Sequence, residues 1–156
     1  MNADEGDGIQ RVPEDEHGEL TRRIIGCGYT VSNVLGCGFL EKVFENALAH
    51  ELRKGSLHVE QQARVPVLYD GVVVGDYIAD LKVENTVLIE VKACQGLDEI
   101  HIAQCLNYLK ATGLSVCLLM NFGKPKLEVR RLVRRKDMAH RIVTGPEIIR
   151  HSRLGL

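Results

Sequence analysis

The chain has 156 residues, of which 45% are hydrophobic and only 4% aromatic, and its formal net charge is −1. This length suits one domain, and the apolar content is sufficient for a core built from Val, Leu and Ile. No apolar run approaches the roughly 18 residues of a membrane span, and the N-terminus is too acidic for a secretory signal. We therefore expect a cytoplasmic protein.

The charge is unevenly distributed along the chain. Residues 1–19 carry seven acids and one base (−6), whereas residues 124–156 carry ten Lys or Arg and three acids (+7). A basic C-terminal third suits a phosphate-backbone partner; a solvated basic face, or pairing with the acidic N-terminus, is the alternative. Residues 1–16 are predicted to be disordered, 17–135 to form the domain and 136–156 to form a basic tail.

Two helices are predicted first. Apolar residues recur at helical spacing from Leu20 to Leu35, and Gly36-Cys37-Gly38 is expected to end this helix. A second amphipathic helix is predicted over 39–54, where Gly55 is a natural stop.

Three strands are predicted next, over 58–69, 72–83 and 86–93. The first two are joined by Asp70-Gly71, a pair typical of a two-residue type I′ hairpin turn. Pro66 has no N–H to give to a β-ladder, so its strand is expected at a sheet edge or with a bulge.

A third helix is predicted over 99–112, with Asp98 as its N-cap and Gly113 at its end. The segment 115–122 is almost wholly apolar, so we expect a strand that is covered on both faces. Residues 127–133 alternate in polarity and predict a more exposed last strand.

The predicted element order is therefore ααβββαββ. The third and fourth strands are separated by a helix and are expected to be parallel, whereas the earlier strands form a meander. This order predicts an α/β fold with layers of helices around a mixed central sheet.

Five cysteines are present, and no two form a CxxC pair. Zinc and iron–sulfur sites need clustered thiolates, so we expect neither. The cysteines fall in segments that look buried and are predicted to be reduced core residues. They are Cys27, Cys37, Cys94, Cys105 and Cys117.

Three charged residues interrupt otherwise apolar strands. Asp80 lies in the second strand, and Glu90 and Lys92 lie two apart in the third, so the last two share a face. Charges within apolar strands are costly unless they meet a metal or one another. The sequence indicates a divalent-metal site beside a lysine, with a cross-strand ion pair on a solvated face as the alternative.

The metal-site hypothesis makes a prediction about strand register. A two-residue turn at Glu84-Asn85 would pair Asp80 with Ile89 and send Asp80 and Glu90 to opposite faces. A three-residue loop or a bulge shifts the register by one and brings Asp80 opposite Glu90. We therefore expect that irregularity.

Phosphodiester hydrolysis is assisted by a divalent metal that polarises the phosphoryl oxygen and acidifies a bound water. Mg²⁺ or Mn²⁺ takes oxygen ligands, which Asp80, Glu90 and the backbone carbonyl of Val91 are predicted to supply. Lys92 is predicted to orient or deprotonate the attacking water, or to stabilise charge on the phosphate.

Two helices are expected to contribute further groups. His101, Gln104 and Tyr108 form one polar stripe on the third helix. Gln104 is a candidate to bind phosphate or a metal-bound water and Tyr108 to support it, whereas His101 is expected to be incidental. A partly exposed amphipathic face is the alternative. Glu41, in the first turn of the second helix, is a candidate third acid that reaches the metal directly or through water. A favourable interaction with the helix dipole is the alternative.

Three motifs occur in a fixed order: Gly38-Phe39-Leu40-Glu41-Lys42-Val43-Phe44, then Asp80 with Glu90-Val91-Lys92, then Gln104-Cys105-Leu106-Asn107-Tyr108. Together they resemble the small bacterial GxxExxY proteins of the PD-(D/E)XK nuclease-like superfamily. The likeness runs from about Leu20 to Val133.

The resemblance implies a restriction-endonuclease-like α/β/α core. It also implies that Asp80 and Glu90 bind the metal, that Lys92 is the catalytic lysine and that Glu41 is the helical acid. The Gln104-to-Tyr108 segment resembles the QxxxY helix of exonuclease-like branches.

Two positions depart from the family pattern. Phe44 replaces the tyrosine of the naming motif, and Ile78 stands where relatives often carry an arginine before the aspartate. We expect a Mg²⁺- or Mn²⁺-dependent nuclease that acts on DNA, with RNA as the second choice. The alternatives are a catalytically silent nucleic-acid-binding or regulatory module, favoured by these departures, and a homo-oligomeric scaffold.

Overall fold

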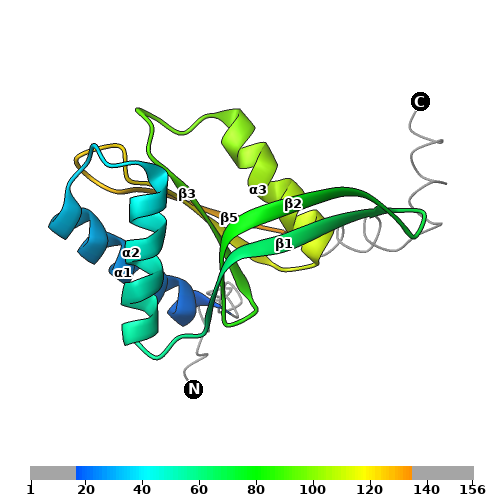
Figure 1. The fold of residues 1–156 in the computed structure, drawn as a ribbon, viewed down its shortest axis with the longest axis horizontal. Coiled ribbons are helices and arrows are strands. Elements are labelled where there is room, and N and C mark those ends of the chain that lie inside the picture. The colour runs from blue at the N-terminus through cyan, green and yellow to red at the C-terminus, as the bar shows by residue number, and fades with distance from the viewer. Residues whose placement is uncertain (1–16, 135–156) are drawn as a thin grey trace, which may run out of the picture.

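The structure of the protein, a computed structural model, describes residues 17–134 (Figure 1). The predictions for 1–16 and for the tail from 136 lie outside the described residues. The elements follow the predicted order ααβββαββ. They are α1 (Gly18–Leu35), α2 (Glu41–Lys54), β1 (Val59–Tyr69), β2 (Val72–Val83), β3 (Val87–Lys92), α3 (Glu99–Thr112), β4 (Val116–Asn121) and β5 (Glu128–Val133).

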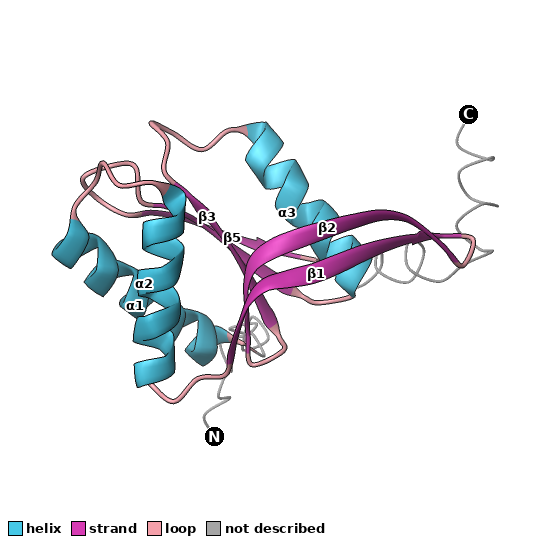
Figure 2. Ribbon diagram, in the orientation of Figure 1, coloured by secondary structure: helices cyan, strands magenta, loops and turns pink. Residues whose placement is uncertain are grey.

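The five strands form one mixed sheet in the order β1-β2-β3-β4-β5. Only β3 and β4 are parallel, and α3 supplies the crossover that parallel neighbours require. α1 and α2 cover one face of the sheet and α3 covers the other (Figure 2). The predicted α/β/α fold with a mixed central sheet is thus confirmed, and it is that of a restriction-endonuclease-like core.

The two central strands are the most buried elements, as their apolar composition predicted. Every residue of β4 is buried, and only Lys92 of β3 is partly exposed. On the α1–α2 face, the rings of Phe44 and Phe122 stack with centroids 5.0 Å apart. β5 is more exposed, also as predicted.

The β1–β2 hairpin extends well beyond the rest of the sheet (Figure 1). Its turn residues Asp70 and Gly71 both have positive φ, 52° and 74°, as a type I′ turn requires. β1 is an edge strand, which is the position predicted from Pro66. β2 pairs with β1 over its whole length but with β3 only over Leu81–Val83.

The N-terminal ends of α2 and α3 are set by the residues that cap them. The Asp98 side chain accepts hydrogen bonds from the N–H groups of Ile100 and His101, and His101 accepts one from the Asp98 N–H. His101 therefore caps α3. α2 begins at Glu41 rather than at the predicted residue 39, because Leu40 is extended and serves as N-cap.

The five cysteines are all free. Cys105 and Cys117 are buried, and Cys27 and Cys94 are partly buried. The prediction of burial is wrong for Cys37, which is exposed because it lies in the turn between α1 and α2. Within the described part of the chain, no helix is both long enough and apolar enough to cross a membrane.

Candidate active site

The loop between β2 and β3 sets the register that the site requires. β2 and β3 pair Leu81 with Ile89 and Val83 with Val87, which leaves a three-residue loop instead of a two-residue turn. Glu84 and Asn85 in this loop both have positive φ, 51° and 54°. The predicted irregularity is therefore present, and the same register continued by one residue places Asp80 opposite Glu90.

Asp80 and Glu90 are tied together where the β2–β3 ladder ends. The Asp80 N–H donates to Glu90 Oε1 (3.0 Å), and the Val91 N–H donates to Asp80 Oδ2 (2.8 Å). Each carboxylate thus takes the place of a carbonyl that a regular ladder would supply. The N–H and C=O of a strand residue point to the same edge, so the Val91 carbonyl also faces the Asp80 side.

β1 is also irregular at the position that would lie opposite Asp80. The ladder pairs Gln61 with Leu81 and Ala63 with Ala79, but Gln62, which would face Asp80, has a φ of 54°. Leu81 packs in the α1–α2 core, whereas Ala79 packs in the α3 core. Side-chain alternation is therefore broken at Asp80, which lies between the two helical layers.

Burial raises the pKa of both carboxylates, so that ionising the two together is unfavourable. Glu90 is only 3% exposed, and burial, followed by the nearby Asp80 charge, raises its pKa to about 8. Burial is also the main cause that raises the pKa of Asp80. The Lys92 ammonium opposes both shifts, so all three side chains share one electrostatic environment.

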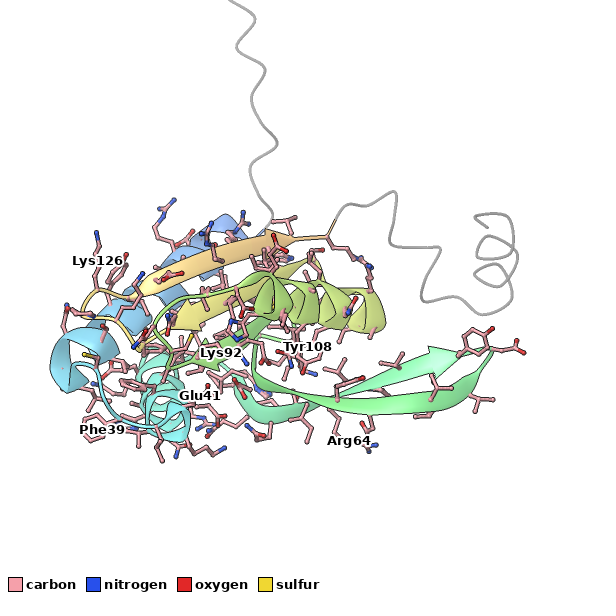
Figure 3. All side chains as sticks on the ribbon, turned by 90° about the horizontal axis from the view of Figure 1, so that it is seen from above. Phe39, Glu41, Arg64, Lys92, Tyr108 and Lys126 are labelled. Carbon is pink, nitrogen blue, oxygen red and sulfur yellow. The ribbon has the colours of Figure 1, made fainter. Side chains whose placement is uncertain are left out.

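Glu41 lies next to this pair but does not join it. Glu41 is exposed in the first turn of α2, and its charge raises the pKa of both Asp80 and Glu90. Figure 3 shows Glu41, Lys92 and Tyr108 in the same region of the molecule. Within residues 17–134, no group of three or more acidic, His or Cys side chains has an arrangement that could hold a metal.

A pocket of about 380 Å³ opens beside Glu41. Phe39, Leu40, Lys42 and Ala93 line it, and Ala93 directly follows Lys92. The Phe39 ring is half exposed and meets the buried ring of Phe44 edge-on, with centroids 6.2 Å apart.

Glu45 is a residue that sequence reasoning missed. It is 3% exposed, one turn after Glu41, and its carboxylate accepts hydrogen bonds from three side chains. These are Lys42 (2.8 Å), Gln61 (2.7 Å) and Gln62 (2.6 Å). Glu45 therefore anchors the irregular part of β1 to α2, and its charge raises the pKa of Asp80. The four-residue spacing from Glu41, which places both acids on one helix face, was the available signal.

The polar stripe of α3 connects to the site through Tyr108. The Gln104 amide donates to the Tyr108 hydroxyl (2.8 Å), which donates to the carbonyl of Ile78 (3.3 Å). Burial and the Glu90 charge raise the pKa of Tyr108 to about 12, so the hydroxyl keeps its proton. The pair thus links α3 to β2 two residues before Asp80.

A second link holds the end of β3. Asn121, fully buried at the end of β4, accepts hydrogen bonds from the N–H groups of Cys94 and Gly123 (both 3.0 Å) and donates to the Cys94 carbonyl (3.0 Å). A Cβ on Gly123 would collide with the backbone of Ala93 and Cys94. The backbone just after Lys92 is therefore fixed by close contact with the β4–β5 loop.

The donor set fits one hard divalent cation better than it fits a soft metal. Mg²⁺ sites commonly use one or two carboxylates and fill the remaining positions with water and substrate oxygens. Asp80 and Glu90 each use one carboxylate oxygen to accept a backbone N–H, and within residues 17–134 no group donates a hydrogen bond to the second oxygen of either residue. Two free carboxylate oxygens and the Val91 carbonyl are the oxygen ligands such a cation takes.

Comparison with protein-family models matches residues 18–132 to the PD-(D/E)XK nuclease superfamily. Among solved structures, an alkaline exonuclease from Laribacter hongkongensis, LHK-Exo, is 17% identical, with a TM-score of 0.47 over 65% of this chain and 59% of that one. The protein SSO0001 is 21% identical, with a TM-score of 0.49 over 80% of this chain and 62% of that one.

The complex of LHK-Exo with dAMP is 12% identical, with a TM-score of 0.45 over 77% of this chain and 85% of that one. The first two matches thus span less than two thirds of the neighbour's own length. Comparison with curated proteins finds no match.

Proposed function

The chain belongs to the PD-(D/E)XK nuclease superfamily, and from this premise we propose that it is a divalent-metal-dependent nuclease. One observation carries the proposal: the carboxylates of Asp80 and Glu90 are tied across β2 and β3, within the field of the Lys92 ammonium. We propose DNA as the substrate ahead of RNA. The order of the three motifs, from Gly38 to Tyr108, supports a place among the GxxExxY proteins.

In the proposed mechanism, Asp80, Glu90 and the Val91 carbonyl would hold one Mg²⁺ or Mn²⁺ ion. When bound, the ion supplies Lewis-acid polarisation of the phosphate and a more acidic water. Glu90 must lose its proton to bind the ion, because its pKa of about 8 keeps it largely protonated at neutral pH. Cation affinity is therefore expected to rise with pH.

The other residues would position substrate and water. Lys92, partly exposed and on the same strand face as Glu90, is placed to orient the attacking water or to stabilise phosphate charge. Glu41, which does not form a three-acid cluster with Asp80 and Glu90 in the described part of the chain, would act through a water. Gln104 and Tyr108 would hold β2 in place, since their hydrogen bonds lead to the Ile78 carbonyl.

The pocket beside Glu41 supports a substrate that carries bases. Phe39 offers a half-exposed aromatic ring, and bases stack on such rings with little sequence preference. Lys42 on the rim of the pocket could meet a neighbouring phosphate.

The test is cleavage of labelled single- and double-stranded DNA and RNA with Mg²⁺, Mn²⁺ or EDTA. Asp80→Asn and Glu90→Gln are expected to lower cleavage at least about 100-fold, because each removes a ligand charge. Asp76→Asn, on the exposed part of β2, is the matched control and should cleave like wild type. Cleavage that survives EDTA or Asp80→Asn would overturn the proposal.

A silent nucleic-acid-binding module is the second candidate. The observation in its favour is Ile78, half exposed just before the site, where an apolar side chain offers nothing to a phosphate. This candidate predicts salt-sensitive binding that is the same with Mg²⁺ and with EDTA, and no cleavage.

A further inference from the structure

The distal part of the β1–β2 hairpin, residues 64–78, is an apolar arm that extends beyond the rest of the sheet (Figure 1). At its base Val65 is buried against α3 and Tyr77 lies beside Tyr108, but most of its large apolar side chains are exposed. Seven of its large apolar side chains are between 49% and 62% exposed. They are Leu68, Tyr69, Val72, Val73, Val74, Tyr77 and Ile78. They occupy both faces of the ribbon, because Leu68 pairs with Val73 and Tyr69 with Val72.

The arm also leaves backbone groups without a strand partner. β2 pairs with β3 only over Leu81–Val83, so among the described residues no strand pairs with residues 72–80 on the side away from β1. Unpaired edges of this kind readily pair with another chain unless charges or proline block them.

The two edges of the arm differ in this protection. On the β1 edge stand Arg64 and Pro66, which discourage pairing. On the β2 edge the sequence Val-Val-Val-Gly-Asp-Tyr-Ile contains no proline and a single charge, Asp76. Asp76 is already paired with Arg64 across the hairpin (2.7 Å). Val74 is the extra residue of a bulge, because Val67 pairs with Gly75 and Leu68 with Val73. With Asp76 and this bulge as its only interruptions among residues 72–78, the β2 edge is the less protected of the two.

The exposed apolar area of the arm is large. Seven side chains of this size, each about half exposed, leave roughly 700 Å² of mostly apolar surface, shared between the two faces of the ribbon. Each partner of a standard protein–protein interface contributes about 800 Å². Summed over both of its faces, the arm therefore exposes an area close to one partner's share of such an interface.

The charge of the arm argues against a phosphate backbone as its partner. Residues 64–78 contain one arginine and two aspartates, a net charge of −1. An apolar, slightly acidic ribbon is suited to a protein surface that is itself apolar.

We propose that the arm is a dimerisation element, in which the β2 edge of one protomer pairs with the β2 edge of a second copy. An edge that pairs antiparallel with itself is compatible with a two-fold axis, so the two partners use the same residues. The two hairpins then form one four-stranded ribbon, in which the apolar side chains along β2 of each copy gain cross-strand neighbours from the other copy. This inference stands on the arm alone and does not require nuclease activity.

The experiment is sedimentation equilibrium of the full chain over a wide concentration range. Wild type is expected to be a dimer, and Val72→Lys/Val74→Lys to raise the dimer dissociation constant at least about 100-fold, because each lysine charges the paired edge. Val34→Lys, at a 77% exposed valine on α1, is the matched control and should stay dimeric. Circular dichroism checks that each variant is folded.

Hydrogen exchange on wild type gives an independent measurement that needs no variant. The amides of residues 72–78 that face away from β1 should be protected at high concentration and lose this protection on dilution. A monomeric wild type, a dimer that the double lysine variant retains, or protection independent of concentration would each overturn the proposal. The last outcome would mean that the arm is covered within one chain.

Discussion

At the scale of single residues, the candidate site is built from groups that do not favour the folded state. Glu90 is almost fully buried, the charge that affects its pKa most is another carboxylate, Asp80, and its pKa is about 8 instead of the usual 4.5. Between pH 4.5 and about pH 8, the folded chain keeps the Glu90 proton, whereas the unfolded chain releases it. The free energy of unfolding must therefore fall as the pH rises through this window.

Glu90→Gln should accordingly stabilise the metal-free protein while it removes cation binding. We expect the free energy of unfolding at pH 8.5 to rise by about 2–4 kcal/mol, and to change little at pH 4.5, where Glu90 is protonated in the folded chain and half protonated in the unfolded chain. Urea unfolding with EDTA measures this at both pH values. Added Mg²⁺ should stabilise wild type but not the variant. Equal stability of the two proteins at pH 8.5 would contradict the buried-charge explanation.

A substitution at Tyr108 tests whether its hydroxyl positions β2. Tyr108→Phe removes the link between Gln104 and the Ile78 carbonyl, so we expect a loss of about 1–2 kcal/mol of stability and a lower kcat with little change in KM. Tyr77→Phe is the control, because the Tyr77 side chain is half exposed and its ring lies 6.0 Å from that of Tyr108. Equal effects of the two substitutions would argue against a positioning role.

At the scale of elements, the end of β3 is held by a loop that is distant in sequence. Gly123→Ala would place a methyl group against the backbone of Ala93 and Cys94, and neither can move without shifting Lys92. We expect a loss of about 1–3 kcal/mol in unfolding free energy, together with most of the activity. Gly96→Ala, with no atom within 4 Å of its new Cβ, is the matched control. Thermal unfolding and cleavage assays on both variants test this.

The helices and strands were predictable because their signals are local. The cap at Asp98, the Asp70-Gly71 turn and the apolar run of β4 each act within a few residues, and the structure has these elements almost as predicted. The pairing of Asp80 with Glu90 was also accessible, because two carboxylates in apolar strands are rarely placed without a reason.

What escaped prediction depends on contacts between distant segments. Glu45 looked like an ordinary helical acid, and only the fold brings Gln61 and Gln62 against it. The apolar run at Val72–Val74 has the composition of a buried strand, yet the structure leaves it exposed. An apolar composition predicts that a strand is buried, but it does not show whether the surface that buries it belongs to the same chain.

At the scale of the whole molecule, the sequence has opposite charges at its two ends. The last 22 residues, 135–156, contain five Lys or Arg and two acids, a net charge of +3. If these bases meet phosphates, their removal weakens binding in a salt-dependent way.

Arg141→Gln/Arg150→Gln/Arg153→Gln should therefore weaken binding of DNA and lower the slope of log K against log salt by about 2–3. The control is Arg22→Gln, at an exposed base on α1. Fluorescence anisotropy with labelled DNA at several salt concentrations measures both. An unchanged slope in the triple variant would exclude these arginines from the contact.

The three-residue loop between β2 and β3 has a consequence for how this protein can evolve. Loops on protein surfaces generally accept changes of length at small cost, and the hairpin tip at Asp70-Gly71 is free to do so. Deleting Asn85 would leave every strand intact, yet it would slide β2 by one step and turn the Asp80 carboxylate away from Glu90. The length of this loop is thus as necessary to the site as the two acids themselves, although none of its three residues has a part in the chemistry.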